Sequence, residues 1–327
     1  MAVMVRTRLY RDGVLTAEGF PYAEISEHLS DPANTVWFDL LAPTPEKLAV
    51  VREELGLHEL AVQDVLQPPP RPKLALYDTH LFLTLYAVSL EHGSAGLHLT
   101  GVSVFVTKNA LVTVRSDESC DIDAIVARWD ASRDMAAHGV SFLLYALIDY
   151  IVDGHFDVAQ GLDDRVEELE DGLFVDNPGN GRGMQRRMFD IRRTTVRFRR
   201  VVLPMREVVN GLLRRDLGVV ASDMAPYYQD VYDHVLRVSD WTESLRDLVG
   251  NVYETHLNLQ GYRMNDIMKR VTSWAAIIAV PTLITGFYGQ NIPFPGFAKD
   301  AGFWTSSLLI VVVSYVLYVI FRRRDWL

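Results

Sequence analysis

The sequence predicts an α+β protein, in which an N-terminal α/β domain is followed by a long helical stalk and two C-terminal transmembrane helices. Three observations predict this architecture. Short apolar runs alternate with helical stretches up to about residue 138, no proline lies between Pro226 and Pro281, and residues 271–290 and 303–321 carry no charge. Alternating strands and helices are typical of an α/β domain, and long uncharged segments are typical of membrane spans.

The composition of the 327 residues excludes several classes of protein. Hydrophobic residues make up 49% and charged residues 23%, as in an ordinary folded protein, so disorder is excluded. The net charge of -10 argues against a general nucleic-acid binder. Cys120 is the only cysteine, which excludes an internal disulfide framework and a multi-cysteine zinc site. No nucleophile–base constellation, phosphate loop or His-x-x-x-His pair occurs, so we expect no enzyme.

The N-terminal domain is expected to end near residue 138. A short helix is predicted from Thr44 to Leu55, because Thr44 can cap it and Pro45 suits its first turn. The prolines of residues 67–72 predict an extended connector. The expected strands are rich in Val, Phe, Leu and Thr and lie at Arg8–Tyr10, Val36–Leu40, Leu81–Val88, Val102–Thr107 and Ala110–Arg115.

A helical hairpin is predicted next. One helix runs from Ser141 to Phe174 and is acidic towards its end, residues 177–183 form a turn, and an arginine-rich helix runs from Met184 to Leu217 with a kink at Pro204. The arginines suit either phosphate or lipid binding or charge pairing with the acidic helix. Charge pairing within the hairpin is the favoured interpretation.

The stretch between Pro226 and Pro281 predicts one continuous helix. Its apolar residues recur at steps of three, four and seven, and about 55 residues at 1.5 Å each span roughly 80 Å. Because its end runs into the first uncharged segment, we expect the stalk and the first membrane span to be one helix. The stripe consists of Tyr227, Val231, Val235, Val238, Leu245, Leu248, Val252 and Leu259.

Two membrane spans are predicted. The 19 residues from Phe303 to Phe321 would rise roughly 28 Å as a helix, about the hydrocarbon thickness. The first span contains hydroxyl residues that suit contact with other helices or water. Lys269 and Arg270 precede it, and Arg322–Arg324 follow the second, so both termini are expected in the cytoplasm of a multi-pass plasma-membrane protein. The alternative, a buried hairpin of a soluble domain, is disfavoured.

No cleavable signal sequence is expected, because the first ten residues include Arg6 and Arg8 and lack an apolar core. The predicted division is 1–138 α/β domain, 139–222 antiparallel helical hairpin, 223–270 stalk, 271–291 first transmembrane helix, 292–302 external loop, 303–321 second transmembrane helix and 322–327 basic cytosolic tail.

A short motif, Tyr288-Gly289-Gln290-Asn291, ends the first span. Glycine and asparagine also serve simply as helix caps. In context the motif resembles the Tyr-Gly-Met-Asn signature of the CorA family of divalent-cation channels, with Gln290 in place of Met; the related ZntB-like branch, which handles zinc, also varies this position. Further marks of the resemblance, in the family's order, are residues 37–40 with 43–44, 57–64, 71–73, 230–234, 263–265 and the basic tail with Trp326-Leu327.

The resemblance implies a homopentamer in the lipid bilayer that transports Mg²⁺, with Co²⁺ or Zn²⁺ as other possible cargo. A selectivity filter at Gly289, Gln290 and Asn291 would hydrogen-bond a hydrated ion, because Mg²⁺ gives up its waters reluctantly. Met268 and Val271 would form an apolar constriction, and Asn265 and Thr272 would relay hydrated ions. The implied pore-facing residues are Asn265, Met268, Val271, Thr272, Ala275, Ala279, Gly286 and Asn291.

Regulation by cytosolic Mg²⁺ is also implied by the resemblance. Asp230 and Asp233 are three residues apart on one helix face, and Asp78 of the α/β domain is a candidate partner across a subunit boundary. The alternative for these carboxylates is a solvated surface. Two further alternatives stay open: a ZntB-like zinc transporter, and a non-conducting membrane-anchored metal sensor or scaffold.

Overall fold

The computed structural model describes residues 5–21, 24–91, 96–173, 181–214, 218–290, 293, 297 and 299–327. The chain divides into two compact units, Met1–Val252 and Tyr253–Leu327. Helix α8 (Ala225–Tyr288) has residues in both units. The finer division expected from the sequence stays a prediction.

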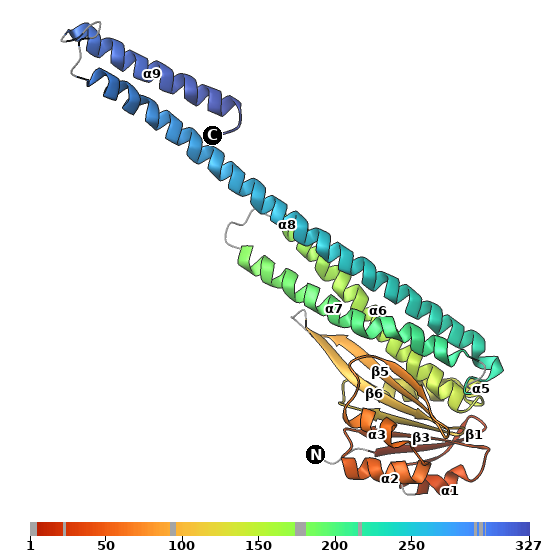
Figure 1. The fold of residues 1–327 in the computed structure, drawn as a ribbon. Coiled ribbons are helices and arrows are strands. Elements are labelled where there is room, and N and C mark those ends of the chain that lie inside the picture. The colour runs from red at the N-terminus through yellow and green to blue at the C-terminus, as the bar shows by residue number, and fades with distance from the viewer. Residues whose placement is uncertain are drawn as a thin grey trace. The chain divides into compact units, whose positions relative to one another are not determined.

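The first unit contains a seven-stranded sheet (Figure 1). The strand order is β2-β1-β3-β7-β6-β5-β4, and every neighbouring pair is antiparallel except β3 with β7. The strands are β1 (Val5–Arg11), β2 (Val14–Glu18), β3 (Asn34–Leu41), β4 (Lys73–Leu76), β5 (Leu81–Leu90), β6 (Leu97–Val106) and β7 (Ala110–Arg115).

The sequence predicts five of these strands but neither β2 nor β4. Both are edge strands of only five and four residues that bury none of their side chains fully, so neither gives the longer apolar run on which the prediction depends. Strand β2 follows β1 through a tight turn at Asp12 and Gly13, which both have positive φ, 51° and 77°. Such angles favour glycine, aspartate and asparagine in two-residue hairpins.

The central strands are buried on both faces. Trp37 of β3 belongs to the core on the side of α4 (Ile122–Ala131) and α6 (Val140–Leu173), whereas the adjacent Phe38 belongs to the opposite core. That opposite core includes residues of α1 (Ile25–Leu29), α2 (Pro45–Leu55) and α3 (Glu59–Leu66). Alternate side chains of a strand point to opposite faces, so the sheet is a middle layer between two helical layers.

A buried ion pair fastens β3 to β7. The Nε of Arg115 donates to both oxygens of Asp39, at 3.1 Å to Oδ1 and 3.0 Å to Oδ2. Its Nη2 donates to Oδ2 at 2.6 Å, and its Nη1 donates to the Cys120 carbonyl at 2.9 Å. Thr113 also donates to Asp39, at 2.7 Å. Asp39 and Arg115 are 1% and 5% exposed. The two charges of this ion pair therefore neutralise each other where solvent cannot reach them.

The long helices follow the expected order. Helix α6 and α7 (Gly181–Leu212) lie beside the first part of α8 in Figure 1, and the three share a core that includes Leu162, Phe198 and Val238. Helix α7 continues through Pro204. It begins three residues before the expected Met184 and ends at Leu212 rather than Leu217, so part of the expected 177–183 turn is helical; residues 177–180 lie outside the described part of the chain.

Charge pairing within the hairpin was the wrong expectation. In the described ranges, the arginines of α7 with ion-pair partners contact α8 rather than α6: Arg199 contacts Glu243 at 3.2 Å and Arg206 contacts Asp240 at 2.5 Å. The physical reason is that the acidic and arginine-rich faces lie away from the core that joins the helices.

Short elements that the sequence analysis did not predict are α1, α3, α4, α5 (Arg133–Ala136) and the 3₁₀ turn Ser222–Met224.

Helix α9 (Asp300–Arg323) completes the second unit and lies alongside the last part of α8 (Figure 1). It extends beyond the predicted span by three residues at its start and two at its end, because Asp300 and the arginines at 322 and 323 join the helix at its polar ends. Acidic residues near a helix N-terminus and basic residues near its C-terminus suit the helix dipole. Beyond the helix, the ring of Trp326 stacks on Phe321.

Candidate functional site

Two helices in the described part of the chain are long and apolar enough to cross a membrane. The most apolar window has a mean hydropathy of 1.5 in α8 and 2.1 in α9. Only 11% of the first window and none of the second is buried by the rest of the chain. The core of a soluble protein would cover such helices, so their exposure disfavours the soluble-hairpin alternative and fits a membrane anchor.

The predicted pore residues of α8 form one exposed stripe. They recur at steps of three, four and seven along the helix, and Val271, one position before Thr272, lies on the flank. Met268 and Val271 are 56% and 58% exposed within the single chain. The exposed members of the stripe are Asn265, Met268, Val271, Thr272, Ala275, Ala279 and Gly286.

The opposite side of this helix is the covered one. Ser273 is 0% exposed and Ile284 is 8% exposed. Ile284 is five residues beyond Ala279, which places it roughly 140° round the helix axis. The packing of the second unit thus uses the face away from the predicted pore stripe, and the stripe stays available to water, lipid or another copy of the chain.

The predicted filter begins where α8 ends. The Gly289 N–H donates to the Thr285 carbonyl at 2.8 Å, and the Gln290 N–H donates to the Phe287 carbonyl at 3.3 Å. A Cβ at Gly289 would lie 3.0 Å from the Thr285 oxygen, so the tight helix end favours glycine. Gln290 is exposed and lines a mainly apolar cavity of about 780 Å³ together with Phe287 and Leu309. Asn291 lies outside the described residues.

Asp230 and Asp233 are exposed on α8, as their spacing predicts, and each contacts a neighbour on the same helix. Asp230 lies 3.7 Å from Nε2 of His234, and Asp233 accepts a hydrogen bond from Gln229 at 3.1 Å. Nowhere in the described residues does one chain bring together three His, Cys, Asp or Glu side chains able to hold a metal ion. Asp230 and Asp233 therefore do not belong to such a group within the described part of one chain.

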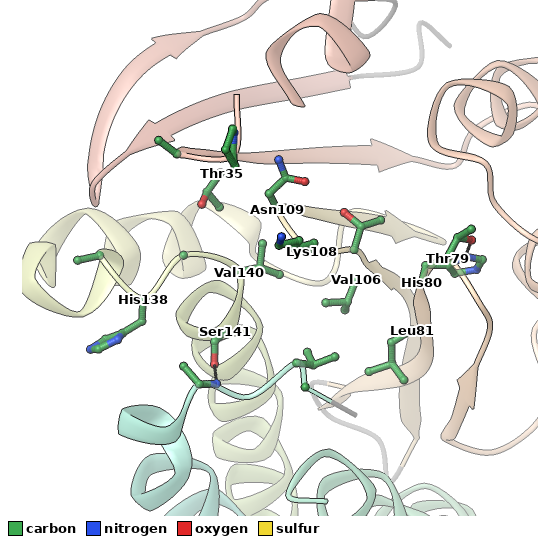
Figure 2. A pocket seen from close by; sticks show the side chains of 18 of the residues that line it. Thr35, Thr79, His80, Leu81, Val106, Lys108, Asn109, His138, Val140 and Ser141 are labelled. Carbon is green, nitrogen blue, oxygen red and sulfur yellow. Dashed lines mark hydrogen bonds between the residues drawn. The ribbon is translucent and has the colours of Figure 1, made fainter. Parts of the chain in front are cut away.

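Asp78 lies elsewhere and lines a cavity of about 590 Å³. Figure 2 shows this cavity at one end of the sheet. Thr35, Lys108 and Ser141 also line this cavity, from β3, the β6–β7 turn and the start of α6. Asp12 and Asp78 are its carboxylates, and Lys108 adds a positive charge. This mixed lining does not favour a cation, and the structure does not join Asp78 to Asp230 or Asp233 within one chain.

A second carboxylate pair lies close to Asp230, and the sequence analysis missed it. Arg128 of α4 contacts Asp149 at 3.1 Å and Asp153 at 2.8 Å, both on α6. Burial raises the pKa of Asp149 above its ordinary value, and the neighbouring Asp153 and Asp230 charges add to this effect. The spacing of four between the α6 carboxylates was the available signal, but only the fold shows their proximity to Asp230.

Comparison with known proteins gives the same family over nearly the whole chain. The model of the family described as "CorA-like Mg2+ transporter protein" matches residues 32–323. A cobalt/magnesium transport protein CorA from Thermotoga maritima is 28% identical over 279 residues, which cover 85% of this chain and 79% of that protein. Its counterpart from Methanocaldococcus jannaschii is 28% identical over 295 residues, covering 89% and 91%.

Solved structures show the same fold. The complete CorA magnesium transporter from Methanocaldococcus jannaschii has a TM-score of 0.79 at 24% identity and covers 100% of both chains. The cytoplasmic domain of ZntB from Vibrio parahaemolyticus has a TM-score of 0.58 at 14% identity, over 80% of this chain and 98% of that one. The family match over residues 32–323, with relatives of similar length, shows that this chain belongs to the CorA-like Mg²⁺ transporter proteins.

Proposed function

We propose that this chain transports divalent cations, Mg²⁺ and also Co²⁺, across the plasma membrane as a homopentameric channel gated by cytosolic divalent ions. The observation that carries the proposal is the exposed stripe of α8, which a ring of copies would bring round one axis. The two relatives described above are cobalt/magnesium transport proteins, which supports the choice of ions. Both termini are proposed to be cytoplasmic, with residues 292–302 outside.

The proposed filter uses neutral oxygen ligands. Mg²⁺ prefers oxygen and keeps several waters, so a ring of Asn291 carbonyls would hydrogen-bond the hydrated ion. Neutral acceptors hold the ion less tightly than a carboxylate ring, which allows it to leave as well as enter. Gln290 adds a second amide beside this ring, where the family signature has methionine.

The proposed gate lies further along the same stripe. Met268 and Val271 would form an apolar constriction that closes by losing its water, since a narrow apolar pore is costly to hydrate. Ion binding between subunits at Asp230 and Asp233 would stabilise the closed ring by neutralising like charges. Loss of the ion would restore repulsion and favour opening. Asp78 is the weaker candidate, because Lys108 lines the same cavity.

Flux measurements with the full chain in proteoliposomes test the transport proposal. We expect Mg²⁺ and Co²⁺ influx that is largely lost in Asn291→Ala and kept in the matched control Asn251→Ala, which changes an exposed asparagine of α8 outside the predicted pore. A zinc-only signal would instead support the ZntB-like alternative. Absence of flux for Mg²⁺, Co²⁺ and Zn²⁺ alike would support the sensor or scaffold, and a monomer in detergent would refute the ring.

Gating is tested separately with internal Mg²⁺. We expect Asp230→Asn with Asp233→Asn to raise the half-inhibitory Mg²⁺ concentration on the order of tenfold, the factor that corresponds to about 1.4 kcal/mol of binding free energy. Asp247→Asn is the control, because Asp247 is an exposed α8 carboxylate paired with its neighbour Arg246. Unchanged inhibition in the double variant would remove both aspartates from the regulatory site.

A further inference from the structure

Helix α7 carries a row of arginines on the side away from the core. Arg186, Arg193, Arg197 and Arg200 are spaced by seven, four and three residues, so they share one face, here named the basic stripe. Arg197 is partly buried and the others are exposed. Among the residues that the structure describes, none of the four has an ion-pair partner.

Helix α6 carries a matching row of opposite sign, here named the acidic stripe. Its members are exposed, share one face by the same spacing rule, and have no ion-pair partner within the described ranges. From Asp157 to Asp171 the row spans 14 residues, as does the row from Arg186 to Arg200, which is about 21 Å in each helix. The acidic stripe consists of Asp157, Asp164, Glu167, Glu168 and Asp171.

The two stripes cannot neutralise each other within one chain. The buried side chains of α6 and α7, such as Leu162 and Phe198, point into the common core with α8. Each stripe lies on the far side of its own helix from that core. Arginines placed between α7 and α8 do form ion pairs, as Arg199 does with Glu243, so the stripes remain unpaired because of where they face.

The stripes nevertheless lie at the same level along the hairpin. At one end Gly172 touches Met184, since a Cβ on the glycine would lie 2.6 Å from the methionine Cε. At the other end the rings of His155 and Phe198 are 6.0 Å apart. Positions along each helix can be counted from these two contacts at 1.5 Å per residue. By this count, each of three acid–arginine pairs has its two members at the same height along the hairpin to within about 6 Å. The pairs are Asp171 with Arg186, Asp164 with Arg193, and Asp157 with Arg200.

Apolar side chains accompany the basic stripe. Phe189 is 65% exposed and Val196 is 40% exposed, and both lie between the arginines on the outer side of α7. A large exposed aromatic side chain beside arginines is typical of a protein–protein interface. A charged face that contacts only water does not explain why the aromatic side chain of Phe189 is exposed there.

We infer that the basic stripe of each copy binds the acidic stripe of the next copy. This inference rests on the proposed ring, in which the symmetry axis runs along the helices. Cyclic rings use two different faces on every subunit, and rotation about such an axis keeps each residue at its level. The two stripes lie at the same level along the helices, have the same length and carry opposite charge, so all three pairs can form at once. The pairs therefore favour the correct neighbouring copy and the correct register between the two helices.

Disulfide crosslinking between differently tagged copies tests the contact. In a Cys120→Ser background, one copy carries Asp164→Cys and the other Arg193→Cys, and the full-length chains are co-expressed in membranes and oxidised. We expect a crosslink between the two copies. When one chain carries both substitutions, we expect a ladder of products up to the closed ring.

The matched control pairs Asp157→Cys with Arg186→Cys, which lie at opposite ends of the two stripes, about 21 Å apart along the helices. A crosslink no stronger than this control would overturn the inference. So would a product confined to single chains. If size measurement still shows the oligomer but the crosslink does not form, the contact between the stripes is refuted and the proposed ring is not. If size measurement shows a monomer, the proposed ring itself is refuted.

The role of charge is tested with the same reporter. Arg200→Asp in the copy that carries Arg193→Cys should slow crosslinking about two- to fivefold, and Asp157→Arg in the other copy should restore it. Raising salt from 0.1 to 1 M, which shortens the Debye length from about 10 to about 3 Å, should also slow it. No response to either change would overturn the proposed charge pairing.

An anionic membrane surface is the competing partner for the basic stripe. A fluorophore on Arg193→Cys, in vesicles of phosphatidylcholine with or without phosphatidylglycerol, distinguishes the two. A spectral change that requires phosphatidylglycerol, together with no crosslink, would overturn the inference in favour of lipid. An unchanged spectrum together with the crosslink supports contact between copies.

Discussion

Replacement of Asp39 by alanine is expected to destabilise the first unit strongly. The substitution leaves Arg115 buried at 5% exposure, without the carboxylate to which its Nε and Nη2 donate, and removes the nearer of the two acceptors of Thr113. Breaking a buried pair from one side costs about 3–5 kcal/mol. For a unit of this size, 1 kcal/mol corresponds to about 2–4 °C, so the Tm should fall by about 6–20 °C.

Tryptophan fluorescence during heating of the full-length protein in detergent measures this change. Trp37 reports on the site, because its indole N–H donates to Thr113 at 3.2 Å and its ring centroid lies 4.9 Å from that of Trp129. Asp31→Ala is the matched control, since Asp31 pairs with Arg11 at 2.9 Å on the surface. An exposed pair contributes about 0–1 kcal/mol, so the control should lower the Tm by less than about 4 °C.

The double substitution Asp39→Leu with Arg115→Met completes the test. Replacing both charges with apolar groups of similar size removes the unpaired charge, so the double variant should recover most of the stability lost in Asp39→Ala. Equal Tm values for Asp39→Ala and Asp31→Ala would refute the reasoning, because they would mean that burial of the unpaired guanidinium costs nothing.

Three other substitutions test separate parts of the chain. Gly13→Ala should cost about 1–3 kcal/mol by thermal unfolding, because φ is 77° and the new Cβ would lie 2.7 Å from the Ala137 nitrogen. Burial lowers the pKa of His155 from 6.5 to about 4, against the smaller opposing effect of its hydrogen bond with Tyr86, so the unfolded chain binds a proton first as pH falls. The free energy of unfolding should therefore decrease by up to about 3 kcal/mol as the pH falls from about 6.5 to 4, and this decrease should be smaller in His155→Gln. An equal decrease in both proteins would contradict the assignment of this pH dependence to His155. Met268→Ser should raise Mg²⁺ flux on the order of tenfold when internal Mg²⁺ is at an inhibitory concentration, which corresponds to a barrier to ion passage lower by about 1.4 kcal/mol. Unchanged flux would exclude this side chain from the constriction.

Much of the architecture was predictable because it depends on local patterns. Apolar runs rich in Val, Phe, Leu and Thr marked β5, β6 and β7, and an uncharged run marked the part of α9 from Phe303 to Phe321. A proline-free stripe marked most of α8, which continues past Pro281 to Tyr288. These signals depend on spacing along the chain, and one sequence contains them in full. The edge strands β2 and β4 gave no such signal, because solvent covers most of their side chains.

The candidate site was predictable only in part. Spacing placed the pore residues on one face of α8, and the structure adds that Ser273 and Ile284 on another face are covered. The filter and the regulatory aspartates were assigned by resemblance, and both depend on contacts between copies. Such contacts are not a property of one chain, so Asn291 and Asp230 stay proposals for experiment.

The sequence by itself determined the order of the long helices and the central strands, the two segments apolar enough to cross a membrane, and the face of α8 that the pore proposal uses. Only the tertiary structure decided how charges are distributed. It paired Asp39 with Arg115 across β3 and β7, and it turned the arginines of α7 away from the acids of α6. Periodicity fixes which side chains share a face of a helix, but the packing of that helix decides which face is buried and which is left for a partner.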